Sequence, residues 1–177
     1  MVKKITKLFI YFIFFILALI VFMPKSSLYF FGEKNLKQFS VIVSDEKIKE
    51  GLFSLSLSDI TIYAKGVDSA KVKKVDATLM LIYNSIDITD IEISSVAAPY
   101  LPTKIKNVDI SYTIFNPLVV NAVSNGEFGE AKAKFDIIKR ELKVYLKPSK
   151  KMLRKYTRSL RYFKKDTKGE YVYAKTF

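Results

Sequence analysis

The chain has 177 residues, contains neither cysteine nor histidine, and carries 30 Lys and Arg against 17 Asp and Glu. Without cysteine there is no disulfide framework and no thiolate chemistry, and without histidine a His-dependent catalytic triad or zinc site is excluded. Half of the residues are apolar, which argues against disorder, and the length suffices for one domain with a core.

The first predicted element is an uncharged apolar run from Leu8 to Met23, preceded by three lysines, Lys3, Lys4 and Lys7. At a rise of about 1.5 Å per residue, this run reaches the low end of the length that spans a bilayer core. Bulky residues follow Ala18 where a signal peptidase needs small ones, so an uncleaved anchor is favoured over a cleaved signal and over a buried soluble helix. The side chains expected to span the membrane include Leu8, Phe12, Phe15, Leu19 and Phe22.

The charges that flank the run predict the orientation of the chain. The three lysines before it outweigh Lys25 after it, which leaves the N-terminus in the cytoplasm. We expect residues 1–23 to be a cytoplasmic tip and signal anchor, 24–38 a juxtamembrane helix or linker, and 39–177 a β domain on the other side of the membrane.

Next comes a stretch from Ser26 to Phe39 that is compatible with a short helix. Its apolar side would be formed by Leu28, Phe31 and Leu36.

From Phe39 onward the apolar residues alternate with a period of two, which is typical of strands with one buried face. The alternation slips between Leu57 and Ile60, and again at Thr89 and Asp90, which predicts a bulge or bend near Asp59 and a second irregularity at Asp90. The expected strands cover 39–44, 53–58, 60–64, 75–83, 86–93, 105–114, 118–123, 131–138, 142–146 and 169–177.

A second helix is predicted from Lys150 to Phe163, with Ser149 as its N-cap. Its apolar stripe would consist of Met152, Leu153, Tyr156, Leu160 and Phe163. The opposite side would be cationic and would carry Lys150, Lys151, Arg154, Lys155, Arg158, Arg161, Lys164 and Lys165.

The basic character of the chain belongs to its C-terminal part. Residues 139–177 carry 14 basic and 3 acidic side chains, whereas residues 24–138 carry 13 and 14. The cationic helix is either simply solvated or contacts an anionic surface, and membrane phospholipid, an acidic protein and nucleic acid all remain open as partners.

No group of residues in the sequence has the pattern of a catalytic or metal site. The densest acidic group is Asp87, Asp90 and Glu92, which alternates with isoleucines and is expected on a solvent-facing side of a strand. No glycine loop suited to phosphate is present. We therefore expect no enzyme, no cofactor, no bound metal and no small-molecule substrate.

Three segments carry a resemblance to a known family: "GLFSLSLSDITIYAKG" from Gly51 to Gly66, "NGEFGEAKAKFDIIKRELKVYLKPS" from Asn125 to Ser149, and the terminal "GEYVYAKTF". With the N-terminal anchor, they resemble the N component of bacterial type II secretion systems and the wider AsmA-like class of membrane-anchored β-proteins. The resemblance implies an inner-membrane protein with a periplasmic sheet that assists secretion, while related machines serve DNA uptake. It implies no catalytic residues.

The predicted fold is mainly β: a single transmembrane helix, then a curved antiparallel meander with one C-terminal amphipathic helix. The expected function is an assembly or contact module of a secretion or DNA-uptake complex, with other envelope proteins as partners. The alternatives are an AsmA-like groove that handles lipid and an envelope protein that binds DNA or another anionic surface. An open groove lined by Leu, Ile and Phe would favour lipid, whereas a closed core would favour a contact module.

Overall fold

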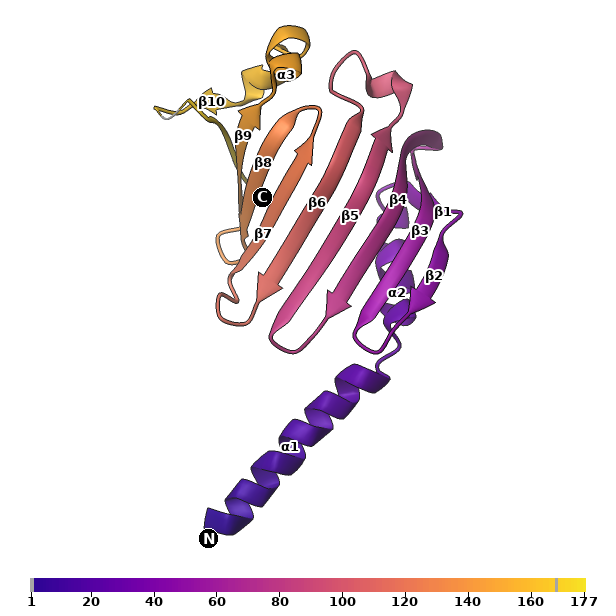
Figure 1. The fold of residues 1–177 in the computed structure, drawn as a ribbon, viewed down its shortest axis with the longest axis vertical. Helices are drawn as coiled ribbons and strands as arrows, with labels where there is room; N and C mark the ends of the chain where they lie inside the picture. The colour runs from indigo at the N-terminus through magenta and orange to yellow at the C-terminus, as the bar shows by residue number, and fades with distance from the viewer. Residues whose placement is uncertain (1, 168) are drawn as a thin grey trace.

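The computed structural model describes residues 2–167 and 169–177, which form one open antiparallel sheet carried on a long N-terminal helix (Figure 1). The predicted mainly β class is confirmed. The elements are α1 (Val2–Phe22), α2 (Lys25–Lys37), β1 (Val41–Ser44), β2 (Lys47–Glu50), β3 (Ser54–Ala64), β4 (Val67–Leu79), β5 (Tyr83–Ile93), η1 (Ser95–Ala97), β6 (Lys104–Thr113), β7 (Val119–Gly126), β8 (Gly129–Asp136), β9 (Glu141–Pro148), α3 (Lys150–Lys155), η2 (Ser159–Tyr162), β10 (Lys164–Lys165) and β11 (Tyr171–Thr176).

The sheet has eleven strands in the order β1-β3-β4-β5-β6-β7-β8-β9-β11-β10, with β2 also paired to β3. From β3 to β9 each strand pairs with the next one along the chain, which is the predicted meander. The edges are short, since β1 and β2 have four residues each and β10 has two. Short edge strands limit unwanted pairing with other chains.

A row of irregular residues crosses four neighbouring strands at one level of the sheet. Asp59 in β3 and Asp90 in β5 adopt left-handed backbone conformations with φ of 59° and 52°. Both residues are passed over in the pairing of neighbouring strands, and so are Lys73 in β4 and Lys106 in β6. Because each of these four strands gains one residue at the same level, their apolar side chains remain on one face above and below the row. Both predicted slips are thus confirmed.

The strand register assigns the side chains to two faces, because directly paired residues of an antiparallel sheet lie on the same face. We call one side the apolar face and the other the polar face. One row of the apolar face consists of Leu57, Val75, Ile88, Val108, Ser124, Ala131 and Leu146.

Helix α2 covers the apolar face over the first strands of the sheet, chiefly β1 to β3. Its Tyr29 packs against the buried cluster of Leu57, Ile60 and Val72. Burial, with a further contribution from the Glu46 carboxylate, raises the pKa of the Tyr29 phenol. The short helix is confirmed, but its predicted apolar side is wrong, since Leu28, Phe31 and Leu36 are exposed. Apolar residues occur on both sides of α2, so the periodicity alone does not reveal which side meets the sheet.

The C-terminal segment covers the same face over the last strands of the sheet, chiefly β9. Met152, Tyr156 and Leu160 form a buried cluster with Leu146 of β9. The side-chain oxygen of Ser149 accepts a hydrogen bond from the Met152 amide at 3.1 Å, which confirms the predicted N-cap.

The predicted continuous helix over 150–163 is wrong, because α3 has only six residues and is followed by the 3₁₀ turn η2. The break at Tyr156 folds the chain back onto the sheet, where the ring centroids of Phe163 and Tyr173 are 5.7 Å apart. Of the predicted stripe, Leu153 is exposed. Packing against β9 and β11 has therefore overridden the helical periodicity.

Two strand predictions also differ from the structure. Strand β2 was missed because its sequence, KIKE, is charged and lies entirely exposed at the sheet edge. Strand β4 covers Val67–Leu79 and not 75–83, because its first half is largely charged and polar and lacks the apolar alternation, and Met80 to Ile82 form an exposed turn.

The junction between α1 and the sheet is held by Lys25 and Glu50. Lys25 is only 2% exposed, and its Nζ donates to the carbonyl oxygens of Ile20, Val21 and Met23 at 3.3, 3.5 and 3.1 Å. This ammonium therefore satisfies acceptors that the end of α1 leaves free. Glu50, at the end of β2, accepts from the Lys25 amide at 2.8 Å and from the amide and hydroxyl of Ser26.

We expect Glu50→Ala to loosen α1 from the sheet. Hydrogen bonds from the Ser26 hydroxyl and then the Lys25 amide hold the pKa of Glu50 below its ordinary value of 4.5. A carboxyl whose pKa is lowered on folding stabilises the structure above its unfolded pKa and loses that contribution as the pH falls through its folded pKa. Spin labels at Phe22→Cys and Lys47→Cys would report the change as a broader distance distribution.

The wild-type distribution should broaden toward that of Glu50→Ala below pH 4.5, whereas the variant should change little with pH. Lys49→Ala, on the same exposed strand, is the matched control and should behave as the wild type. A Glu50→Ala distribution as narrow as the wild-type one at neutral pH would contradict the role of the junction.

Candidate binding surface on the apolar face

The centre of the apolar face is left uncovered by the described residues. Helix α2 contacts chiefly β1 to β3, and α3 contacts β9, so β5 to β8 lie between them. We call the residues of this centre the central apolar surface: Val75, Ala77, Ile86, Ile88, Val108, Ile110, Ala122 and Ala133. Val75 and Ile88 form its border, since they also pack against the α2 cluster, while Ile86 is 40% exposed and the others are half-buried. None of them is fully buried.

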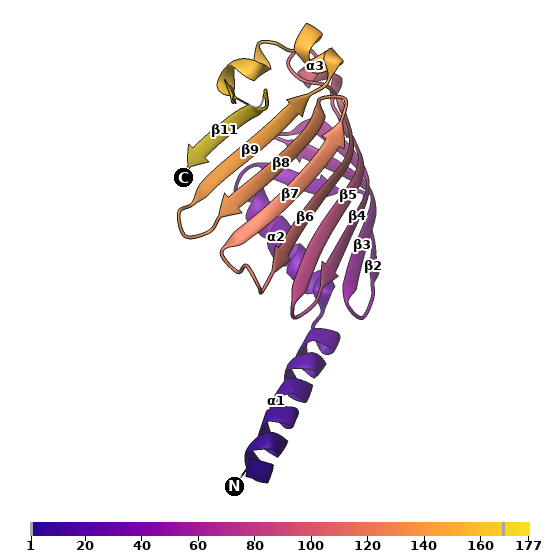
Figure 2. The ribbon, with the colours of Figure 1, turned by 60° about the vertical axis from the view of Figure 1, so that its left-hand side comes forward.

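This surface lies between the two buried clusters. It is bordered on one side by α2, which lies behind the strands in Figure 2, and on the other by α3 and η2. Leu28 and Phe31 of α2 are exposed and add apolar area beside the sheet. Apolar area left uncovered in this way is typical of a binding surface, not of a completed core.

A pocket of about 230 Å³ adjoins the surface near α3. It is lined by Leu101, Ile105, Phe128, Val144, Met152 and Phe163. Because these side chains are all apolar, the pocket suits a hydrocarbon group and offers no polar group for orienting a reacting substrate.

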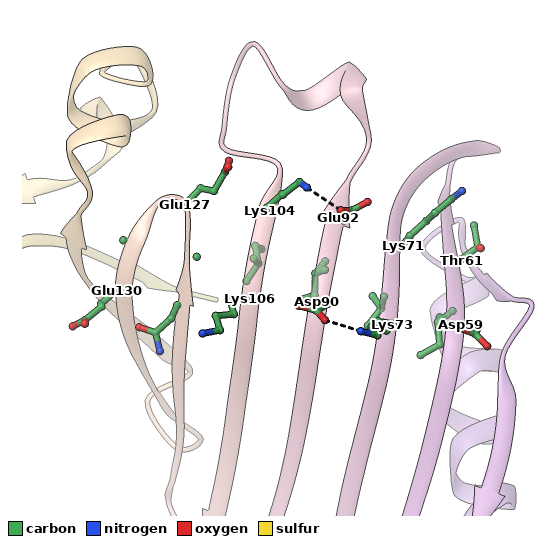
Figure 3. Close-up of a pocket in the computed structure, with 17 residues that line it drawn as sticks. Asp59, Thr61, Lys71, Lys73, Asp90, Glu92, Lys104, Lys106, Glu127 and Glu130 are labelled. Carbon is green, nitrogen blue, oxygen red and sulfur yellow. Dashed lines mark hydrogen bonds and ion pairs between the residues drawn. The ribbon is translucent and has the colours of Figure 1, made fainter.

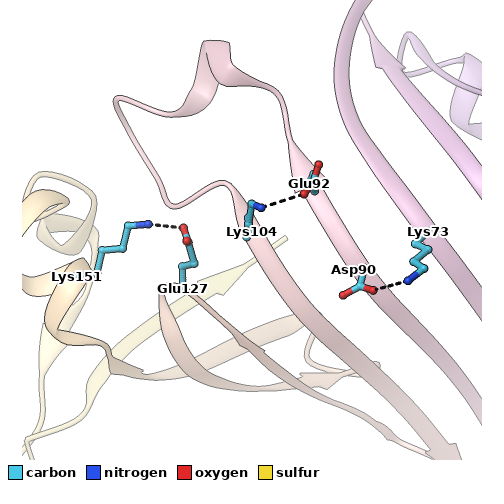
Figure 4. Close-up of polar contacts among 6 residues, drawn as sticks. All are labelled: Lys73, Asp90, Glu92, Lys104, Glu127 and Lys151. Atoms are coloured by element: carbon cyan, nitrogen blue, oxygen red, sulfur yellow. Dashed lines mark hydrogen bonds and ion pairs between the residues drawn. The ribbon is translucent and has the colours of Figure 1, made fainter.

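The polar face holds a wider open trough of about 1000 Å³ along the row of irregular residues (Figure 3). Charged side chains of opposite sign alternate along it, and Figure 4 shows three ion pairs among its residues and α3. The Nζ atom of Lys73 lies 3.3 Å from Oδ2 of Asp90, and that of Lys104 lies 3.3 Å from Oε1 of Glu92. The Nζ atom of Lys151 lies 2.6 Å from Oε2 of Glu127. Exposed pairs of this kind contribute about 0–1 kcal/mol each. They also neutralise one another, which leaves little net charge for a ligand.

The acidic residues singled out in the sequence do not converge on one point. Asp90 and Glu92 are engaged in the ion pairs of the trough, while Asp87 accepts a hydrogen bond from Ser85 at 3.2 Å. Asp87 instead lies in a cross-strand row with Asp76 and Asp109. Although burial would raise the pKa of Asp76, hydrogen bonds from Lys74 and Ser56 lower it overall.

Across residues 2–167 and 169–177, no three His, Cys, Asp or Glu side chains are grouped as metal ligands.

The predicted cationic residues lie at the strand ends remote from α1 (Figure 1). All eight are exposed: Lys150, Lys151, Arg154, Lys155, Arg158, Arg161, Lys164 and Lys165. Lys151 pairs with Glu127, and Lys155 lies 5.6 Å from the ring centroid of Tyr156. Within the described residues the others have no carboxylate partner. We call these eight residues the basic segment; they share one end of the sheet without forming one helical face.

Helix α1 projects away from the sheet, and Lys4–Phe22 is long and apolar enough to cross a membrane. None of that stretch is buried in the described protein, so a core helix of a soluble domain does not fit. The predicted spanning side chains, Leu8, Phe12, Phe15, Leu19 and Phe22, are between 49% and 84% exposed.

The fold and surface together define an open antiparallel sheet on a helix that can anchor it to a membrane. No protein-family model, curated protein or solved structure matches this chain.

The central apolar surface should tolerate polar substitution far better than the clusters beneath the helices. Ile86 is 40% exposed, whereas Val72, in the α2 cluster, is 4% exposed. We expect Ile86→Ser to lower the free energy of unfolding by less than about 1 kcal/mol and Val72→Ser by about 3 kcal/mol. Urea unfolding followed by circular dichroism measures both. Equal losses would indicate that Ile86 belongs to a closed core.

Proposed function

We propose that this protein handles lipid at a membrane, with the central apolar surface holding the acyl chain of a lipid from the bilayer that α1 spans. The observation that carries the proposal is the uncovered apolar face between α2 and α3. The lipid alternative needs an apolar surface that stays open, and the side chains between α2 and α3 are Ile, Val and Ala where a groove of Leu, Ile and Phe was expected. A protein partner that buries the same surface is the outcome that the crosslinking test below distinguishes.

The position of this surface relative to α1 supports the proposal. The junction of Lys25 and Glu50 ties α1 to the end of β2, at the same end of the sheet as the β4–β5 and β6–β7 turns. An acyl chain could therefore pass from the bilayer onto the sheet along an apolar route. Because the acyl chain leaves one apolar environment for another, the free energy of this exchange is close to zero. Such a balance suits transfer of the lipid better than tight binding of it.

The compartment follows from the charges around α1. Lysines before the helix favour a cytoplasmic N-terminus, which would place the sheet in the periplasm of a cell with an inner membrane. An uncleaved anchor is part of this proposal, since the surface needs the bilayer beside it.

Photocrosslinking tests the proposal with the full chain in nanodiscs that contain a phospholipid carrying a diazirine near the end of one acyl chain. We expect crosslinks on the apolar face of β5 to β8, around Ile86 and Ile110. The double variant Ile86→Asn with Ile110→Asn should lose most of them, because desolvating two amides opposes binding of hydrocarbon.

The matched control is Thr89→Asn with Ser111→Asn, on the polar face of the same strands, which should crosslink as the wild type does. Crosslinks confined to α1 would overturn the proposal. So would a dimer that buries Ile110 against a second copy, and that result would favour a contact module.

A second function, contact with an anionic partner in an envelope complex for secretion or DNA uptake, is supported by the basic segment. Arg154, Arg158 and Arg161 are exposed and unpaired within the described residues. Cations without local partners are available for an acidic protein surface or for phosphates.

Reversing these charges tests whether DNA or an acidic protein is the anionic partner of the basic segment. We expect the full chain to bind duplex DNA in fluorescence anisotropy with an affinity that falls steeply with salt. Arg154→Glu with Arg158→Glu and Arg161→Glu should abolish that binding, whereas Lys132→Glu with Lys134→Glu on β8 should weaken it only slightly. Salt-insensitive binding, or binding retained by the triple variant, would exclude DNA as the partner of this segment.

A further inference from the structure

The turns at one end of the sheet expose large apolar side chains beside turn-forming residues such as Gly51, Asn116 and Pro117. Turns favour Gly, Pro, Asn, Asp and Ser. Here the β2–β3, β4–β5, β6–β7 and β8–β9 connections and the residue after β11 all expose large apolar groups. We call this set the apolar rim and represent it by Leu52, Leu81, Ile82, Phe115, Ile138 and Phe177.

The exposure of the rim is high for side chains of this size. Phe115 is 83% exposed and Ile138 is 69% exposed. Five separate points of the chain contribute to the rim, so it does not arise from one unusual loop. An apolar edge of this extent on a folded domain indicates a contact surface.

The register places all of these turns at the same end of the sheet. Ser54, at the start of β3, is paired with Thr78, and this row continues through Ser85, Ser111 and Asn121. The turns lie just beyond that row, and the Phe177 amide joins them by donating to the Arg140 carbonyl oxygen at 3.0 Å.

Helix α1 meets the sheet at this same end. Glu50 binds the amides of Lys25 and Ser26, and Leu52 follows Glu50 by two residues. In Figure 1 the lower turns of the sheet lie toward the point where α1 joins it. The apolar stretch of α1 ends at Phe22, so the boundary of a bilayer spanned by α1 falls close to the rim.

The charges beside the rim also suit a membrane surface. Lys139 and Arg140 follow Ile138 and are exposed. The neighbouring acids offset these two cations only in part, since Glu141 pairs with Lys143 at 2.9 Å and Asp136, which accepts from the Lys139 amide at 2.9 Å, supplies a single negative charge. Cations at the edge of an inserted apolar group favour anionic headgroups.

We propose that the apolar rim inserts into the interface of the bilayer that α1 spans, so that the sheet stands on the membrane at its turns. A bilayer is the fitting occupant because the rim is a row of protruding side chains without a groove, and a fluid phase can close around such a row. This inference goes beyond lipid handling, since the rim would insert whether or not the central apolar surface binds an acyl chain. If both hold, the inserted rim opens that surface directly to the lipid.

Depth-dependent quenching tests the rim with the full chain in nanodiscs. Because the chain contains no cysteine, a single introduced cysteine carries an environment-sensitive fluorophore at one known position. We expect labels at Phe115→Cys and Ile138→Cys to shift to shorter wavelength and to be quenched several-fold more by lipids with a nitroxide near the headgroup than by a water-soluble quencher.

The matched controls are Val96→Cys and Tyr100→Cys, in the exposed loop between β5 and β6 at the opposite end of the sheet. They should show the reverse preference. Leu81→Asp with Ile138→Asp should return the label at Phe115→Cys to the behaviour of the controls, while α1 keeps the chain in the disc.

Equal quenching at both ends of the sheet, or quenching at the rim by the soluble reagent alone, would overturn the inference. So would protection of the rim from both quenchers, which would indicate a protein partner. None of these results alters the acyl-chain crosslinks expected around Ile110, so the rim and the lipid-handling function fail independently.

Discussion

The constraint on which this structure depends is the mismatch between one large apolar sheet face and the two short helices available to cover it. Helix α2 has 13 residues and α3 has six, while the sheet has eleven strands. Each helix buries a cluster at one end, and the strands between them keep an apolar face without a second layer. Because a sheet normally buries such a face against another element, the uncovered centre is where a ligand or partner is needed. The proposed handling of acyl chains follows from this geometry.

The row of irregular residues makes so large a face possible. A slip of alternation in one strand alone would send its apolar side chains to the opposite face. Here Asp59, Lys73, Asp90 and Lys106 compensate one another because they lie side by side in neighbouring strands. Their charges alternate in sign, and Lys73 pairs with Asp90. The same row thus keeps the apolar face continuous and lines a nearly neutral trough on the polar face.

The junction at Lys25 and Glu50 fixes where α1 joins the sheet relative to this face. One side chain occupies the free carbonyl groups at the end of α1, and the other binds the first amides of α2. The apolar rim, the open end of the central apolar surface and the end of α1 consequently lie together, while the basic segment lies at the remote strand ends. Under the proposed function, lipid contact and contact with an anionic partner occupy opposite ends of the strands.

The sequence by itself determined the features that depend on local patterns. The apolar run after three lysines, the strand alternation, the slips at Asp59 and Asp90 and the cap at Ser149 depend on residues close together in the chain. Only the tertiary structure decided which side of α2 meets the sheet, where the C-terminal helix breaks, that the charged strand β2 exists and that Glu50 binds the start of α2. It also decided that the apolar face is left open, because coverage depends on how far each helix reaches across strands that are distant in sequence. Periodicity reports that a residue has an apolar side, whereas packing alone decides what lies against it.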